Sequence, residues 1–215
     1  MKKLNFIIKC GLALLLLSFY SCESWLNVTP SDRLSEEMLF NDREGFVKAL
    51  NGVYIELNTN ELYGRNLTAG ALDVMGQYYS VASSSHAFYN YGGLVYTGND
   101  EKALFDNMWQ KCYAVIACCN TIIEKCDENK AGLSPVWRGS IKGEALALRA
   151  MLHFDMLRLF GPLTSELDKE SIPYQTNSDQ TVTPLLSGSE VVGLILDDLK
   201  NAVGLLKDTD PYFVE

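Results

Sequence analysis

Two long amphipathic segments, joined by a short polar turn, limit most strongly what this chain can fold into. The first follows Asn99-Asp100 and keeps apolar residues at helical spacing as far as Cys126. The second begins at Ser134-Pro135, where serine can cap a helix and proline suits the first turn, and it stops at Gly161-Pro162. Each segment predicts a helix of about 27 residues. Because only residues 129–133 separate them, we expect antiparallel neighbouring helices.

A shorter amphipathic segment lies on each side of this pair. Residues 41–57 carry an apolar face, and Asn41 with Glu44 can form the capping box of a first helix. Ser187 and Glu190 can form the same box for a fourth helix, which we expect to end near Lys207 and to stack against the central pair. Four such helices predict a solenoid-like helical architecture.

The sequence GEALALRAMLHF, residues 143–154, has the small-residue spacing of a tetratricopeptide helix. Ala145, Ala147 and Ala150 would let a neighbouring helix approach closely. Long connections separate the other helices of the chain. We therefore predict the fold class all-α, a tetratricopeptide-like helical scaffold with long loop insertions.

The connection between the first two helices, residues 58–99, is unusually long and rich in aromatic residues. It contains much Gly and Ser and shows no sustained helical or strand period. A connection of this length is usually functional or disordered, and its aromatic content argues against disorder. Its principal aromatic residues are Tyr63, Tyr78, Tyr79, Phe88, Tyr89, Tyr91 and Tyr96.

Residues 1–21 are typical of a lipoprotein signal peptide. Three lysines within the first nine residues precede an apolar run through residues 11–20. The run is too short for a membrane span, because only about ten uncharged residues are available where roughly twenty are needed. Cys22 follows Phe19-Tyr20-Ser21, which resembles a bacterial lipobox, in which the cysteine is acylated and becomes the first mature residue. The alternative is ordinary cleavage nearby with an incidental cysteine.

The charge of the remaining chain restricts its partners. Without the three lysines of the signal, 15 of the 18 basic side chains remain against 27 acidic ones, a net charge near −12. A polyanion is bound through basic patches, and the sequence has no cluster of Lys or Arg. We therefore expect no nucleic-acid partner.

The cysteines of the second predicted helix are spaced for packing. Cys112, Cys119 and Cys126 recur every seven residues, so neighbours lie about 10.5 Å apart along the axis, too far for a disulfide. We expect them to be small buried side chains. Since no Cys or His spacing suits a metal ion, we expect no metal site and no cofactor.

Catalytic patterns are also absent from the sequence. It has no Gly-x-Ser-x-Gly elbow and no Gly-rich phosphate loop, and His86 and His153 have no partner at ligand spacing. Asp197 and Asp198 are adjacent on a predicted helix, so their side chains diverge by about 100° and do not form a hydrolytic pair. We therefore expect a protein that is not an enzyme.

Three phrases of the chain carry a family resemblance. Cys22 precedes a short hydrophobic phrase and a helix that ends in Gly52-Val53-Tyr54. The second phrase, Trp-x3-Tyr-x2-Ile-x3-Asn, is formed by Trp109, Tyr113, Ile116 and Asn120. The third, Gly-Glu-Ala-x3-Arg-Ala with an aromatic-Gly ending, is formed by Gly143, Glu144, Ala145, Arg149, Ala150, Phe160 and Gly161. In this order, over nearly the whole mature chain, the phrases resemble the SusD/RagB family of outer-membrane lipoproteins.

The resemblance implies both a fold and a function. Members have an α-helical, tetratricopeptide-containing scaffold and bind glycans at the cell surface as lids of TonB-dependent (SusC-like) outer-membrane transporters in Bacteroidetes. It implies an outer-membrane protein anchored by lipid on Cys22 and exposed at the cell surface, with an oligosaccharide or polysaccharide as ligand. Family chains are usually more than twice this length, so residues 22–215 are expected to be an N-terminal helical domain of a truncated protein. The alternative function is a helical-repeat lipoprotein that serves only as a protein-interaction scaffold.

The resemblance also points to candidate ligand-binding residues, because family members commonly take ligand aromatics from the loop between the first helices. Candidates for stacking on sugar are Tyr78, Tyr79, Tyr89 and Tyr91, and candidates for hydrogen bonding are Asp73, Gln77 and Asn90. The alternative is that the tyrosines merely plug the loop onto the helices. The helical residues of the phrases, such as Asn120 and Arg149, are expected to hold the scaffold together rather than to touch sugar.

Overall fold

The computed structural model describes residues 36–179, 181–206 and 211. The predicted signal peptide and Cys22 therefore lie outside the described residues. The chain divides into two units, Met1–Met38 and Leu39–Glu215, and the second contains the helical body. A one-turn helix, α2 (Glu36–Leu39), crosses the boundary between the units along the sequence.

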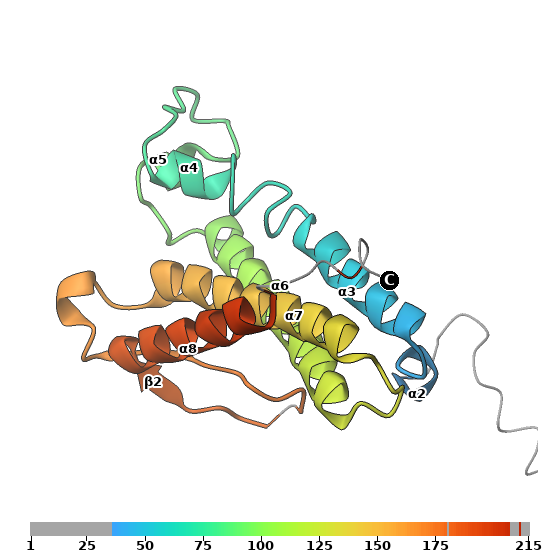
Figure 1. The fold of residues 1–215 in the computed structure, drawn as a ribbon. Coiled ribbons are helices and arrows are strands. Elements are labelled where there is room, and N and C mark those ends of the chain that lie inside the picture. The colour runs from blue at the N-terminus through green and yellow to red at the C-terminus, as the bar shows by residue number, and fades with distance from the viewer. Residues whose placement is uncertain (1–35, 180, 207–210, 212–215) are drawn as a thin grey trace, which may run out of the picture. The chain divides into compact units, whose positions relative to one another are not determined.

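Four long helices form the helical body (Figure 1). They are α3 (Arg43–Leu57), α6 (Asn99–Glu128), α7 (Pro135–Phe160) and α8 (Gly188–Leu206). The mainly helical fold that the apolar spacing predicts is confirmed. α6 packs against α3 and α7, and α8 packs chiefly against α7, so each long helix mainly contacts its neighbours in chain order. The apolar faces meet in one buried core.

The helix ends follow the predicted capping signals, with one shift. Ser134 accepts a hydrogen bond from the Trp137 backbone N–H at 3.4 Å, as expected for a cap. Ser187 and Glu190 form the predicted box, with bonds of 2.9 and 3.3 Å to each other's backbone N–H groups. The cap of α3, however, is Asp42 and not the expected Asn41: the Asp42 carboxylate accepts from the Gly45 N–H at 2.9 Å, since Asp42 is the last extended residue before the helix.

Small residues bring α7 close to its neighbours. Of the three alanines of the tetratricopeptide-like spacing, Ala145 and Ala150 are fully buried, as close packing requires, whereas Ala147 is partly buried. At Gly143 a Cβ atom would lie 2.7 Å from the Leu206 Cγ of α8, so only glycine fits without moving that side chain. Close contact between α7 and α8 at this point therefore depends on Gly143.

The cysteines of α6 are free, and three of them are buried as predicted. Cys112, Cys119 and Cys126 are each 0% exposed, whereas Cys118 is exposed. Burial raises the pKa of Cys119 and of Cys126 to about 12. These thiols therefore act as small apolar side chains in the core.

Two insertions interrupt the helical body. The first, residues 58–98, contains the short helices α4 (Ala71–Met75) and α5 (Tyr89–Gly92). The second, residues 161–187, contains a 3₁₀ turn, η2 (Thr164–Glu166), and an unpredicted antiparallel pair of strands, β1 (Glu170–Pro173) and β2 (Leu185–Ser187). Glu170 pairs with Ser187, and Pro173 pairs with Leu185. Within the part of the chain that is described, none of the helices combines the length and the apolar character needed to cross a membrane.

Arg149 of α7 is the centre of a buried polar network. Its Nε and Nη2 donate to the two carboxylate oxygens of Asp198 on α8, each at 2.7 Å, and its Nη1 donates to Asn120 Oδ1 of α6 at 2.8 Å. Burial by itself lowers the pKa of Arg149, but the hydrogen bonds to Asp198 and the charge of Asp198 raise it by more. The net pKa is therefore raised, and the guanidinium stays charged. The network therefore ties three long helices together.

Neighbouring hydrogen bonds hold the middle of the second insertion by its main chain. Asn120 Nδ2 donates to the carbonyls of Gln175 and Asn177 at 3.2 and 2.8 Å, and the Tyr113 hydroxyl donates to the Pro173 carbonyl at 2.8 Å. His153 Nε2 accepts from the Gln175 backbone N–H at 3.0 Å. These contacts confirm the scaffold role expected for the helical residues of the family phrases.

Glu144 and Arg149, five residues apart on α7, take separate partners. The Tyr54 hydroxyl of α3 donates to Glu144 Oε2 at 2.9 Å, whereas Arg149 pairs with Asp198 of α8. Burial, followed by this hydrogen bond, raises the pKa of Tyr54 to about 12. Glu144 therefore links α7 to α3, whereas Arg149 links α7 to α6 and α8.

Candidate functional site

The first insertion exposes three of the four tyrosines proposed to stack on a ligand. Tyr78 is 80% exposed, Tyr79 52% and Tyr89 42%. α4 ends at Met75, and Gln77 takes a positive φ of 61°, which reverses the chain so that the Tyr78 N–H returns to the Asp73 carbonyl at 2.9 Å. This local turn leaves the next two tyrosine rings uncovered by the helices.

Tyr91 is placed differently from the other three. It is only 3% exposed, and its ring lies edge-to-face with Phe88 and with Phe105 of α6, at centroid distances of 5.8 and 6.0 Å. Its hydroxyl donates to the Asp100 carbonyl at 3.4 Å, and burial raises its pKa. Tyr91 therefore packs the insertion onto α6, as the alternative interpretation of the tyrosines expects.

The proposed hydrogen-bonding residues mostly hold the insertion together. Gln77 Nε2 donates to the Gly92 carbonyl at 2.9 Å, which joins the end of α4 to α5. Asn90 Nδ2 donates to Glu101 Oε1 at 2.7 Å and lowers the pKa of that carboxyl group. Asp73 is half-buried on α4, and among the described residues none donates a hydrogen bond to its carboxylate. Asp73 therefore has the most freely available polar side chain of the three.

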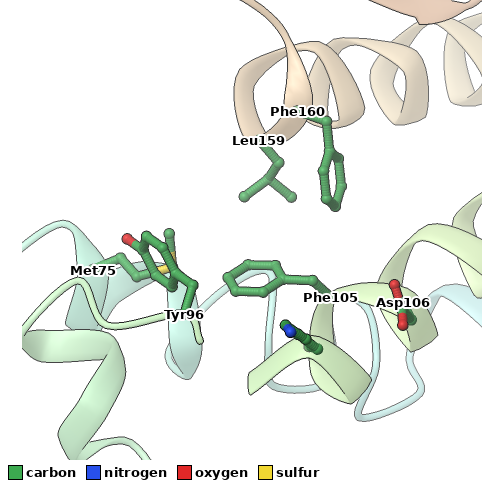
Figure 2. Close-up of a pocket in the computed structure, with 7 residues that line it drawn as sticks. Met75, Tyr96, Phe105, Asp106, Leu159 and Phe160 are labelled. Carbon is green, nitrogen blue, oxygen red and sulfur yellow. The ribbon is translucent and has the colours of Figure 1, made fainter. Parts of the chain in front are cut away.

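A pocket of about 440 Å³ lies where the first insertion meets the long helices (Figure 2). We call it the aromatic pocket. Its lining comes from α4, the segment before α6, the first turns of α6 and the end of α7: Met75, Tyr96, Lys102, Phe105, Asp106, Leu159 and Phe160. None of the residues proposed from the sequence is in its lining. Two features of the sequence point to this pocket: Tyr96 is one of the aromatic residues of the first insertion, and Phe160 belongs to the aromatic-Gly ending of the third family phrase.

Aromatic rings stand at right angles around this pocket. Phe105 lies edge-to-face with Tyr96, at 5.5 Å between centroids and 84° between planes, and with Phe160, at 6.3 Å and 86°. Trp109 supports Phe160 from α6, with centroids 5.0 Å apart. Partial burial raises the pKa of Tyr96, so its hydroxyl stays protonated and can donate a hydrogen bond.

Two charged side chains of α6 complete the lining. Lys102 and Asp106 are exposed and lie one helical turn apart, and no oppositely charged side chain of the described residues forms an ion pair with either. A ligand can therefore meet a donor and an acceptor beside the rings. Within residues 36–179 and 181–206, no group of three or more His, Cys, Asp and Glu side chains could hold a metal ion.

Solved structures share this fold. One is a SusD superfamily protein from Bacteroides thetaiotaomicron, with a TM-score of 0.59 and 20% identity over 76% of this chain and 37% of that chain. Another is a SusD superfamily protein from Bacteroides vulgatus, with a TM-score of 0.60 and 21% identity over 80% of this chain and 36% of that chain. Both confirm the helical scaffold that the sequence predicts.

Curated relatives from Formosa agariphila match at the sequence level. SusD-like protein P38 is 27% identical over 85% of this chain, and SusD-like protein P2 is 26% identical over 96% of it. The matched regions are 34% and 38% of those two proteins, so the chain spans little more than a third of their length. A family model described as "starch-binding associating with outer membrane" matches residues 24–213, nearly the whole chain. The chain therefore belongs to the SusD-like family, as its three sequence phrases predicted.

Proposed function

We propose that the chain binds carbohydrate at the outer membrane through the exposed tyrosines of its first insertion. The observation that carries the proposal is the exposure of three rings, Tyr78, Tyr79 and Tyr89, on one insertion of a SusD-like chain. A sugar ring has an apolar face of C–H groups, which packs on the face of an aromatic ring, while its hydroxyls bond to nearby polar groups. Asp73 is placed on α4 beside the turn and supplies an acceptor.

The partner proposed for the chain is a TonB-dependent, SusC-like transporter, for which the protein would act as a lid in the uptake of an oligosaccharide or another nutrient. This role rests on membership of the SusD-like family. Binding of a glycan requires no catalytic group, so we propose that the chain is not an enzyme.

A protein-interaction scaffold is the second candidate function, and one surface favours it. α7 and α8 enclose a groove of about 370 Å³ with a wholly apolar lining. Phe154 and Leu196 line it and are 47% and 48% exposed. An apolar groove between two helices suits the apolar face of a partner helix. Glycan binding is the better supported function because the family description itself names a polysaccharide.

The tyrosine proposal predicts a measurable loss of glycan binding. In affinity electrophoresis with a panel of polysaccharides, the wild-type protein should be retarded by at least one of them. The double change Tyr78→Ala and Tyr79→Ala should weaken that binding about tenfold or more, because each lost ring contact contributes about 1 kcal/mol. Tyr54→Ala is the control, since Tyr54 is 44% exposed but lies on α3, and circular dichroism verifies that the fold survives the loss of its bond to Glu144. Unchanged retardation of the double variant, or an equal effect of Tyr54→Ala, would refute the assignment.

We also propose that a lipid on Cys22 anchors the chain to the outer membrane at the cell surface. Each buried methylene of an acyl chain contributes about 0.8 kcal/mol. The three acyl chains of a bacterial lipoprotein therefore hold it on the membrane without any hydrophobic surface on the protein itself. Cys22→Ala should therefore move the protein from the membrane to the soluble fraction after cell lysis, and protease added to intact cells should digest only the anchored form. Membrane recovery and acyl labelling that persist in Cys22→Ala would contradict the anchor.

A further inference from the structure

We propose that the aromatic pocket holds one uncharged sugar ring and that Asp106 excludes acidic sugars from it. This inference rests on the proposed carbohydrate binding and adds to it a second contact site. The site is built from residues other than the three exposed tyrosines. Asp106 is then a specificity-determining residue.

The size and walls of the pocket suit a sugar ring. A volume of about 440 Å³ lies within the usual range of small-ligand sites. Figure 2 shows Leu159 and Phe160 projecting from the end of α7 toward Phe105, with Met75 and Tyr96 to the left of Phe105. A ring that enters between them can place its C–H face on an aromatic side chain and its hydroxyls toward α6.

The rings are held in place without a ligand. Tyr91 packs on Phe105, with centroids 6.0 Å apart, and Trp109 packs on Phe160, with centroids 5.0 Å apart. Tyr113 in turn packs on Trp109, with centroids 4.7 Å apart. Since these side chains are already ordered, little conformational entropy is lost when a ligand binds.

The two charges at the pocket decide which sugars fit. An uncharged sugar can accept a hydrogen bond from Lys102 and donate one to Asp106. An acidic sugar gains attraction from Lys102 but meets repulsion from Asp106, one turn along α6. Without the three lysines of the predicted signal peptide the chain has a net charge near −12, which adds to the repulsion. The pocket therefore favours a hydroxymethyl group over a carboxylate.

The test uses the methyl signal of Met75, a residue of the pocket lining. The protein is labelled with ¹³C-methyl methionine, and the Met75 signal is assigned with Met75→Leu. It is then titrated with methyl glucoside and with methyl glucuronoside, which differ only in CH₂OH against COO⁻. The Met75 signal should shift with the glucoside, and the glucuronoside should bind at least about tenfold more weakly. Tyr96→Ala should weaken the binding of both sugars.

Asp106→Asn should bring the affinities for the two sugars within about threefold of each other. Asp127→Asn is the control, because it makes the same charge change on the same helix about 30 Å away, and the surface ion pair with Lys142 that it breaks contributes little to stability. Equal affinities for the two sugars in the wild type, or the same change in both Asn variants, would overturn the role of Asp106.

The outcomes also separate this inference from the proposed function. Retardation by a polysaccharide with no shift at Met75 leaves the tyrosine site standing and overturns the pocket. A shift at Met75 with no retardation by any polysaccharide supports the pocket and overturns binding of polymers by the exposed tyrosines. No response in either measurement overturns both. Circular dichroism of each variant shows whether the helical fold is retained.

Discussion

Asp198→Ala is expected to lower the free energy of unfolding by about 3–5 kcal/mol, because it leaves the Arg149 guanidinium buried without its partner. The two side chains are only 8% and 9% exposed, and two hydrogen bonds of 2.7 Å join them. The same change removes the acceptor of the Tyr174 hydroxyl, which donates to Asp198 Oδ2 at 2.6 Å. Urea unfolding followed by circular dichroism measures the loss.

Two control variants identify the cause of this loss. Replacing both charges together, with Arg149→Met and Asp198→Leu, should recover much of the stability, since no uncompensated charge is then buried. Lys48→Ala breaks the exposed pair with Glu44 and should leave the urea midpoint unchanged. A midpoint for Asp198→Ala equal to that of the wild type would show that the buried pair contributes nothing net.

Acidification from pH 6.5 to pH 4 is expected to remove about 3 kcal/mol of stability through His153 alone. The side chain is 0% exposed, and burial is the main reason that its pKa falls from 6.5 to about 4. The Arg149 charge lowers it further, whereas the Arg149 carbonyl and Asp198 act in the opposite direction. Tyr174 stacks on the ring at 3.9 Å, so water does not reach that face.

The hydrogen bonds of His153 explain why the folded protein keeps the ring neutral. Nδ1 donates to the Arg149 carbonyl at 2.9 Å, and Nε2 accepts from the Gln175 N–H at 3.0 Å, so a proton on Nε2 would face another donor. The unfolded chain binds that proton near pH 6.5 and the folded chain only near pH 4. The stability is therefore complete above pH 6.5, is lost between pH 6.5 and 4, and is not reduced further by this group below pH 4.

A comparison with His153→Gln isolates this contribution from the carboxyl groups that titrate over the same range. The variant should be less stable at pH 7.5, but its urea midpoint should fall less steeply between pH 6.5 and 5 than that of the wild type. Parallel pH profiles for the two proteins would show that His153 is not the group responsible.

The long helices could be predicted because their signals are local. The apolar spacing of α6 and α7 and the Ser134 cap are contained in continuous stretches of sequence. The strands β1 and β2 have four and three residues, too few for a period of two to be recognised, and they pair across an insertion. Whether the two strands pair depends on how α6 and α7 hold the insertion, and no local sequence pattern encodes that.

The candidate site was only partly predictable for a related reason. Tyr89 and Tyr91 have the same side chain and lie two residues apart on α5, yet one is 42% exposed and the other 3%. The difference depends on which side of α5 faces α6, and that orientation is a tertiary property. The aromatic pocket is lined by four separate parts of the chain, and Arg149 pairs with Asp198, 49 residues away, so neither can be recognised from local spacing.

The main-chain hydrogen bonds that hold the second insertion leave part of its sequence free to vary. Side chains of α6 and α7 hold residues 173–177 through main-chain carbonyls and one N–H group. Every amino acid offers the same carbonyl, so substitutions of the exposed residues Thr176 and Asn177 keep the attachment while they change the surface. Tyr174 is the exception, because its buried side chain packs on His153 and bonds to Asp198. The scaffold can therefore present different side chains at this position without a change in its fold.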